Sequence, residues 1–186
     1  SRDALEPHLP SLLPTLFRYT FDPNPRVANA MRQLWAALVP DPKPALTKHL
    51  QPVLEHLCAS LGDRLWRGRE SACLALAELL PGRTLAELSP TLARLLTALL
   101  RVLDDVKETV RKAAEPAWRA VSSACVRLSD GGRASASDAE AVLEIALPIL
   151  LDGVLLPSEE ARRTTAAATA TATASPRVRH GWTAPA

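Results

Sequence analysis

The sequence has few aromatic residues and little glycine, and its charges nearly cancel. Aromatic residues make up 4% of the chain, and glycine occurs only seven times in 186 residues, a composition that disfavours an all-β fold. The 22 basic residues are balanced by 20 acidic residues, so we expect no field that attracts a polyanion and no nucleic-acid partner. No apolar run approaches the ~18 residues of a membrane-spanning helix, so we expect no direct insertion into a membrane.

The sequence also lacks the patterns of enzyme and metal sites. Its three cysteines, Cys58, Cys73 and Cys125, are odd in number and share no C-x-x-C spacing, so they predict neither a disulfide framework nor a zinc site. Cys73 and Cys125 fall on the apolar stripes of expected helices, which is typical of core thiols in a reducing compartment. There is no glycine-rich phosphate loop, no G-x-S-x-G elbow and no HExxH motif. We therefore expect no enzyme activity, no metal and no cofactor.

What the sequence does contain is a repeated pattern. Each copy begins with an aspartate and reaches, five residues later, an anchor that opens a run of small and apolar residues. The clear copies join Asp22 to Val27, Asp63 to Gly68 and Asp105 to Val110, and a weaker fourth copy has its anchor at Ala161. The anchors are 41, 42 and 51 residues apart. Two helices with tight turns fill about 40–47 residues, which is the period of HEAT and armadillo repeats.

Apolar residues recur at helical spacing on both sides of each aspartate-bearing turn. The pattern predicts helical units over about residues 5–40, 45–82, 86–130 and 138–163, within one array over residues 1–163. We expect an all-α fold, an α-α superhelix of HEAT type with about three and a half repeats. The repeat is already under way at Ser1, as expected of a piece of a longer protein.

The fourth unit opens with a helical pattern and then loses it. The position eight residues after the anchor holds Trp35, Leu76 and Trp118 in the first three units, but Thr169 in the fourth. Burial of a Leu or Trp side chain contributes about 1.5–3 kcal/mol, and burial of Ala far less. Residues 164–175 contain only Ala, Thr and Ser, so we expect residues 164–186 to form a frayed or disordered low-complexity tail; a frame-shifted terminus is the alternative explanation.

The recurring charged residues suggest a series of contacts, which we call the ladder, with one contact, or rung, in each repeat. The candidate ladder residues are Asp22, Asp63, Asp105, Arg69, Arg111 and Arg162. One interpretation is a charged stripe that meets a partner. The interpretation that we favour is bonding between repeats, in which each aspartate caps the following helix and each arginine reaches the turn of the neighbouring unit.

Trp66 differs from the other tryptophans of the array. Trp35 and Trp118 share one repeat position with a leucine of the second unit, so we expect them in the core. Trp66 occupies no repeating apolar position and lies in a turn among arginines. Because Trp and Arg are enriched at binding hot spots, Trp66, Arg64 and Arg67 are candidate partner contacts. Burial of Trp66 against the next unit is nevertheless the more common outcome for such a residue.

Three stretches of the sequence resemble consecutive stretches of one known family. The first is Arg18-Tyr19-Thr20-Phe21-Asp22-Pro23-Asn24, with Met31 and Trp35-Ala36-Ala37-Leu38-Val39 after it; the second runs from Trp66 to Arg83; the third runs from Asp104 to Glu115. Taken together and in this order, they are similar to the proteasome adapter and scaffold family of very large HEAT-repeat proteins. The sequence departs from the family at Pro116 and after Arg163.

The resemblance implies a non-enzymatic molecular adaptor. Members of the family tether the regulatory and core particles of the proteasome, monitor faulty assemblies, and link proteasomes to membranes and motors. The resemblance therefore implies the 26S proteasome as partner and the cytoplasm and nucleus as location, with ER or endosomal membranes reached through partners. It assigns no catalytic or contact residue to this chain.

Two other interaction modules are alternatives. A tubulin-binding HEAT domain also places a Trp and basic residues in repeat turns, but in the turn of its first repeat, whereas Trp66 is in the second. A transport receptor of the importin type has inner helices with acidic or Trp/Asn arrays, which are absent from this sequence.

Overall fold

The computed structural model describes residues 8–126, 140, 143–149 and 151. The helices with defined bounds are α1 (Leu9–Tyr19), α2 (Pro25–Leu38), α3 (Pro42–Lys48), α4 (Leu50–Ser60), α5 (Trp66–Leu79), α6 (Leu85–Leu88), α7 (Leu92–Leu103) and α8 (Glu108–Val126). Residues 143–149 are also helical, and no strand occurs among the described residues. The prediction of an all-α array of HEAT type is confirmed.

Contacts divide the chain into two units, residues 1–155 and 156–186, and every described residue belongs to the first. Arg162 and the tail over residues 164–186 lie outside the described residues, as does most of the fourth unit predicted over residues 138–163. The described residues therefore lie mainly in the first three predicted units.

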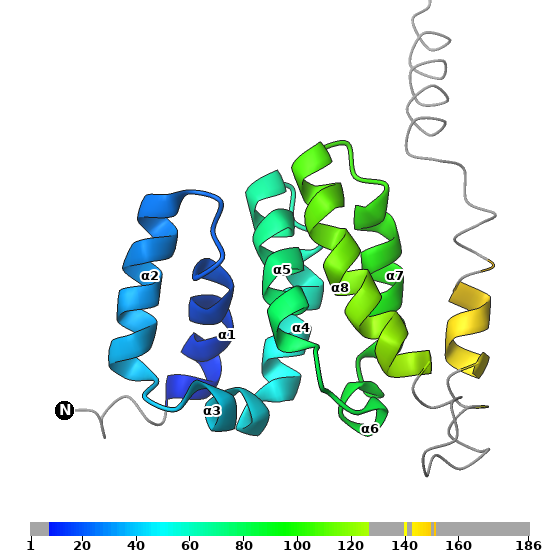
Figure 1. Ribbon diagram of the computed structural model, residues 1–186, viewed down its shortest axis with the longest axis horizontal. Helices are drawn as coiled ribbons and strands as arrows, with labels where there is room; N and C mark the ends of the chain where they lie inside the picture. Colours follow the sequence, from blue (N-terminus) through cyan, green and yellow to red (C-terminus); the bar gives the residue numbers. More distant parts are fainter. Residues whose placement is uncertain (1–7, 127–139, 141–142, 150, 152–186) are drawn as a thin grey trace, which may run out of the picture. The chain divides into compact units, whose positions relative to one another are not determined.

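Three pairs of long helices follow one another: α1 with α2, α4 with α5, and α7 with α8 (Figure 1). The first helix of each pair packs on the first helix of the next, since α4 contacts both α1 and α7. The second helices of the last two pairs, α5 and α8, share the most extensive contact in the array. Each pair therefore buries its apolar stripe against the neighbouring pair, as in a solenoid.

The helix α2 is an exception to this close packing. It packs on α1 but makes little contact with α5, and only Ala28 among its residues is fully buried. Leu34 is 43% exposed. A groove of about 1010 Å³ is bounded by α1, α2, α3 and the C-terminal end of α5 with the loop that follows it, and Phe17, Phe21 and Trp35 are among its lining residues.

The core is built from leucine and small residues rather than aromatic rings. Its largest fully buried side chains are Leu13, Leu54, Leu57, Leu76, Leu80, Leu88, Leu92, Leu95 and Leu99, with Val53, Val110 and Val121. Trp35 and Trp118 are half-buried and pack against this core. Cys58 and Cys73 are buried, and Cys125 is half-buried.

Two short helices lie between the long pairs and were not anticipated from the periodicity. The helix α6 begins with a capping box. The Thr84 side chain accepts a hydrogen bond from the Glu87 N–H, and the Glu87 carboxylate accepts a hydrogen bond from the Thr84 N–H. The chain reaches α6 through Gly82, whose φ of 80° is accessible to glycine but strained for other residues. Local capping and turn chemistry therefore interrupt the helical pattern at α6, whereas α3 has no side-chain cap.

Candidate interaction surface at the repeat turns

The three turns inside the helix pairs share one local structure. In each turn the Oδ1 atom of the recurring aspartate accepts a hydrogen bond from the backbone N–H two residues later. The donors are Asn24 for Asp22 at 2.8 Å, Leu65 for Asp63 at 3.0 Å, and Lys107 for Asp105 at 2.8 Å. Each aspartate thus fixes the turn that leads into the second helix of its pair.

Arg69 joins the second turn to the third. Its Nη1 atom donates to the backbone carbonyls of Asp63 and Arg64, at 2.8 and 3.2 Å, within its own turn. Its Nε and Nη2 atoms donate to the two carboxylate oxygens of Asp105 in the next turn, at 2.5 and 2.9 Å. This is a bidentate ion pair between neighbouring repeats, the strongest geometry that a guanidinium group and a carboxylate can adopt.

The ion pair also changes the titration of Asp105. Burial by itself would raise the pKa of Asp105, but the hydrogen bonds from Arg69 and the Lys107 N–H, with the charge of Arg69, together hold that pKa below its ordinary value. Asp105 is therefore ionised at neutral pH, and the pair links the two repeats as a charged contact.

The other candidate ladder residues do not form an equivalent pair among the described residues. Arg111 repeats only the contacts within its own turn, where Nη1 donates to the carbonyls of Asp105 and Val106 at 2.6 and 3.1 Å. The first repeat has Ala28 at the position of Arg69, so no arginine there can reach Asp63. One complete rung is thus present in the described part, and it joins the second and third repeats.

Other hydrogen bonds also cross between repeats and involve residues that the sequence analysis missed. The buried Arg18 of α1 donates from Nη1 to the Ser71 Oγ of α5 at 2.9 Å, and Ser71 in turn donates to the Gly68 carbonyl. Thr109 donates to the Glu70 carboxylate at 2.5 Å. No repeating signal marks these residues, because each contact occurs at a single interface.

Trp66 begins α5 and is half-buried at the edge of the core. The guanidinium carbon of Arg67 lies 5.5 Å from its ring centroid, and the Nζ atom of Lys107 lies 5.1 Å from it. Both distances are within the range of cation–π attraction. The Trp66 ring thus contacts basic side chains of its own turn and of the next turn. It packs partly against the core and is partly accessible to solvent.

The surroundings of Trp66 form a surface that we call the Trp66 patch, made up of Arg64, Leu65, Trp66, Arg67, Val106 and Lys107. Leu65 is 69% exposed and Val106 is 56% exposed. The three basic side chains of the patch are also exposed. Exposed apolar and basic groups around a partly accessible tryptophan are typical of a protein-binding surface rather than a catalytic site.

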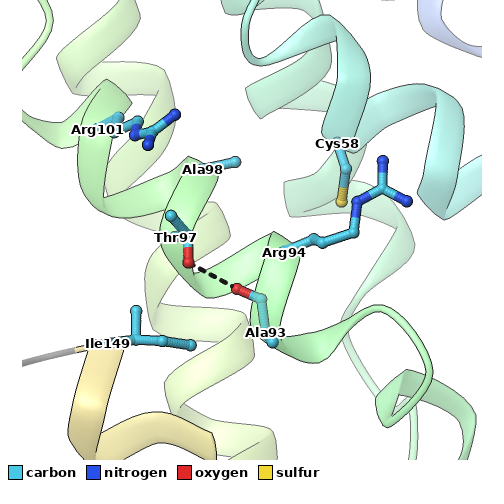
Figure 2. A pocket seen from close by; sticks show the side chains of 7 residues that line it. All are labelled: Cys58, Ala93, Arg94, Thr97, Ala98, Arg101 and Ile149. Carbon is cyan, nitrogen blue, oxygen red and sulfur yellow. Dashed lines mark hydrogen bonds between the residues drawn. The ribbon is translucent and has the colours of Figure 1, made fainter.

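Another hollow, of about 400 Å³, lies along α7 (Figure 2). Figure 2 shows Arg94 extending toward Cys58 of α4, while Arg101 lies further along α7 and Ile149 borders the other side. Burial raises the pKa of the Cys58 thiol to about 11, so the thiol stays protonated at neutral pH and is a poor nucleophile. The hollow therefore contains no activated group.

The described residues offer neither a metal site nor a membrane-spanning helix. No group of three or more His, Cys, Asp or Glu side chains in this part of the chain is placed to hold a metal ion. None of the described helices is both long and apolar enough to cross a bilayer. The turn edge is therefore the surface that the arrangement of side chains singles out.

The fold and this surface define the class of protein: an array of stacked helix pairs of HEAT type, with recurring turns along one edge (Figure 1). The chain belongs to the family of proteasome adapter and scaffold proteins. It is 43% identical over 150 residues to the proteasome adapter and scaffold protein ECM29 of Homo sapiens, a match that covers 81% of the chain and 8% of that protein.

Other relatives agree with this assignment. The chain is 32% identical over 175 residues to the proteasome-associated protein ECM29 homolog of Drosophila melanogaster, and 31% identical over 160 residues to the proteasome component ecm29 of Schizosaccharomyces pombe. These matches cover 82% and 83% of the chain, and 9% and 10% of the relatives. The chain thus spans about a tenth of the length of these relatives. No family model and no solved structure matches it.

Proposed function

We propose that the chain is part of a non-enzymatic adaptor that binds the 26S proteasome and supports its assembly, stability and quality control. The observation that carries the proposal is the 43% identity with a protein named as a proteasome adapter and scaffold. The names of the relatives from fly, fission yeast and budding yeast also refer to the proteasome. The regulatory and core particles are the partners that this function requires.

A stacked helical array supports such a function because it holds surface residues at fixed separations without needing a cleft. We assign the contact to the Trp66 patch. Trp66, Arg64 and Arg67 provide an aromatic anchor and two exposed guanidinium groups, and Lys107 adds a third positive charge. A patch of this charge favours an acidic surface on the partner.

We also propose that the protein works in the cytoplasm and nucleus, and that it reaches ER or endosomal membranes only through partners. The support is the set of three free cysteines, which is compatible with a reducing compartment. Fractionation of cells that express the tagged protein tests this, and recovery in the secretory lumen would contradict it.

The test of the proposed function is capture of purified 26S proteasome on the immobilised chain, measured by hydrolysis of a fluorogenic peptide. We expect the wild-type chain to retain proteasome. The triple variant Arg64→Glu, Trp66→Ala, Arg67→Glu should bind at least about tenfold more weakly, which corresponds to ~1.4 kcal/mol. The melting temperature of this variant should stay close to that of the wild type if the Trp66 ring mainly contacts a partner rather than the core.

The matched control is the double variant Arg94→Glu, Arg101→Glu, which makes the same change of charge on exposed positions of α7. It should bind like the wild type. Failure of the wild-type chain to retain proteasome, or recovery of tubulin or importin cargo from cell extract in its place, would overturn the proposed function. Equal binding by the triple variant would overturn the assignment of the Trp66 patch.

A further inference from the structure

The Trp66 patch is a composite of two successive repeats. Residues 64–67 lie where the second turn enters α5, whereas Val106 and Lys107 belong to the third turn, which leads into α8. The two parts meet where the Nζ atom of Lys107 lies 5.1 Å from the centroid of the Trp66 ring. Because the two turns belong to different helix pairs, the patch keeps its shape only while the separation of these pairs is fixed.

Each part of the patch is held from behind by an arginine of the helix that follows its turn. Arg69 of α5 donates from Nη1 to the Arg64 carbonyl at 3.2 Å. Arg111 of α8 donates from Nη1 to the Val106 carbonyl at 3.1 Å. These bonds fix the backbone that carries the exposed side chains of the patch.

The ion pair between Arg69 and Asp105 joins the two parts. Nε and Nη2 of Arg69 donate to the two carboxylate oxygens of Asp105, and the Oδ1 atom of that carboxylate also accepts the Lys107 N–H at 2.8 Å. One connected set of hydrogen bonds thus runs from the Arg64 carbonyl to the Lys107 backbone. A planar guanidinium group that is bound through all three of its nitrogens has little freedom, so this set fixes the distance between the turns.

The pair lies behind the patch rather than within it. The side chains of Arg69 and Asp105 are 18% and 8% exposed, whereas Leu65 is 69% exposed and Val106 is 56% exposed. A partner that covers the patch therefore meets the exposed side chains, and the ion pair acts on that partner only through them.

The junction between the first and second repeats provides a comparison. It has Ala28 at the position of Arg69, so no arginine joins its two turns in this way. Residues 23–26, which correspond to residues 64–67, contain no aromatic side chain and have Arg26 as their single basic side chain. The ion pair and the composite patch therefore occur together at the junction of the second and third repeats.

We propose that Arg69 and Asp105 are positioning residues for the Trp66 patch. Their ion pair holds Lys107 beside the Trp66 ring, so that the basic and apolar groups of two repeats meet one partner together. This inference rests on the assignment of partner binding to the patch under the proposed function. Without the pair each turn keeps its own hydrogen bonds, but binding then has to order one turn against the other, which weakens it.

The first test is spectroscopic and needs no partner. It follows the indole ¹⁵N–¹H signal of Trp66, which senses the Lys107 ammonium group near its ring. In Arg69→Gln this signal should move toward its position in Lys107→Gln, while the signals of the other tryptophans stay in place. An unshifted Trp66 signal would overturn the proposal.

Arg83→Gln is the matched control for this measurement. Like Arg69, Arg83 donates from Nε and Nη1 to a backbone carbonyl and to side chains, but it lies beyond the opposite end of α5. Its replacement should leave the Trp66 signal in place. A shift as large as that of Arg69→Gln would show that the signal reports general loosening of the fold, and would overturn the proposal.

The second test measures binding of purified 26S proteasome to the immobilised chain. Arg69→Gln and Asp105→Asn should each bind about three- to tenfold more weakly than the wild type, at a temperature where circular dichroism shows them folded. Asp105→Asn is the milder change, because its amide oxygen can still accept the Lys107 N–H and so keep the turn. Arg83→Gln should bind like the wild type. Wild-type binding by both Arg69→Gln and Asp105→Asn would overturn the proposal.

A double-mutant cycle separates positioning from direct contact. If Arg69 acts through Lys107, Arg69→Gln should weaken binding much less in a chain that already carries Lys107→Gln. Strictly additive losses would overturn the proposal. A wild-type chain that retains no proteasome would overturn the proposed function instead, and the indole signal then decides this inference alone.

Discussion

At the scale of single residues, the pair between Arg69 and Asp105 links two repeats through side chains that are largely buried. The Arg69 side chain is 18% exposed and the Asp105 side chain 8% exposed, so solvent screens their attraction less than it screens a surface pair. Asp105 also accepts a hydrogen bond from the Lys107 N–H. One carboxylate thus fixes a turn and joins two neighbouring repeats.

We expect Asp105→Ala to lower the free energy of unfolding by about 2 kcal/mol, because it removes the hydrogen bond that fixes the turn and a bidentate charged contact. Urea unfolding measures this loss. A double-mutant cycle with Arg69→Ala isolates the contribution of the pair, and strictly additive losses would show that the two side chains do not interact energetically.

His56 gives a pH-dependent prediction. Burial lowers the pKa of His56 below 6.5, and the nearby charge of Arg18 lowers it further; its Nε2 atom is buried without a hydrogen-bond partner. Below pH 6.5 the unfolded chain binds the proton more readily than the folded chain. The stability associated with neutral His56 is therefore lost as the pH falls through the folded-state pKa.

Urea unfolding between neutral pH and about pH 5 tests this linkage. His56→Gln should lose less stability over that interval than the wild type, because glutamine does not titrate. His49→Gln is the control and should follow the wild-type pH dependence. A parallel curve for His56→Gln would exclude His56 as a source of acid sensitivity.

At the scale of elements, α8 is notable for continuing through a proline. Pro116 lies inside the helix Glu108–Val126 and is exposed. Proline cannot donate to the carbonyl four residues earlier, so the helix forms despite an unfavourable residue. The extensive contact of α8 with α5, together with the packing of α7 against it, provides the tertiary stabilisation that offsets this cost.

We expect Pro116→Ala to raise the free energy of unfolding by up to about 3 kcal/mol, the difference in helix propensity between the two residues. The exposed position means that no core contact is lost. Pro14→Ala in α1 is the comparison: Pro14 is buried, so its replacement also removes packing and should stabilise less. An unchanged urea midpoint for Pro116→Ala would show that the helix has already adapted to the proline.

At the scale of the whole array, α5 has more neighbours than α2, since it contacts α1, α4 and α8. Leu76 lies in the last turn of α5 and is fully buried. By contrast, α2 rests mainly on α1 and leaves Leu34 43% exposed. The stability of the stacked layers therefore depends far more on α5 than on α2.

We expect Leu76→Ala to cost about 3 kcal/mol, as is usual for a leucine truncated in a packed core. Leu34→Ala should cost less than about 1 kcal/mol because much of its side chain already contacts water. Thermal unfolding followed by circular dichroism compares the two. Similar losses would mean that α2 packs as tightly as α5 in solution.

The sequence by itself determined the helical pairs and their stacking. Apolar spacing, the turn aspartates and the anchor interval are properties of residues close together in the chain, and an array of this kind is stabilised mainly by contacts between sequential neighbours. The same local chemistry predicted that each aspartate caps the following helix, whereas the structure places the aspartates in the turn, and Asn24 and Leu65 are the N-cap residues of α2 and α5. It did not predict α3, which has no side-chain cap, or α6, where a capping box competes with the longer periodicity.

The tertiary structure alone decided which arginine meets a carboxylate, how far α2 stands from α5, and how much of Trp66 is accessible. Arg18 and Ser71 meet although 53 residues separate them, and no pattern in the sequence marks that pair. Such contacts depend on the distance and rotation between successive layers. The distance and rotation between layers are set by the packing of whole helices. Two arginines at the same repeat position therefore differ: Arg69 pairs with a carboxylate of the next turn, whereas Arg111, within the described residues, bonds only to its own turn.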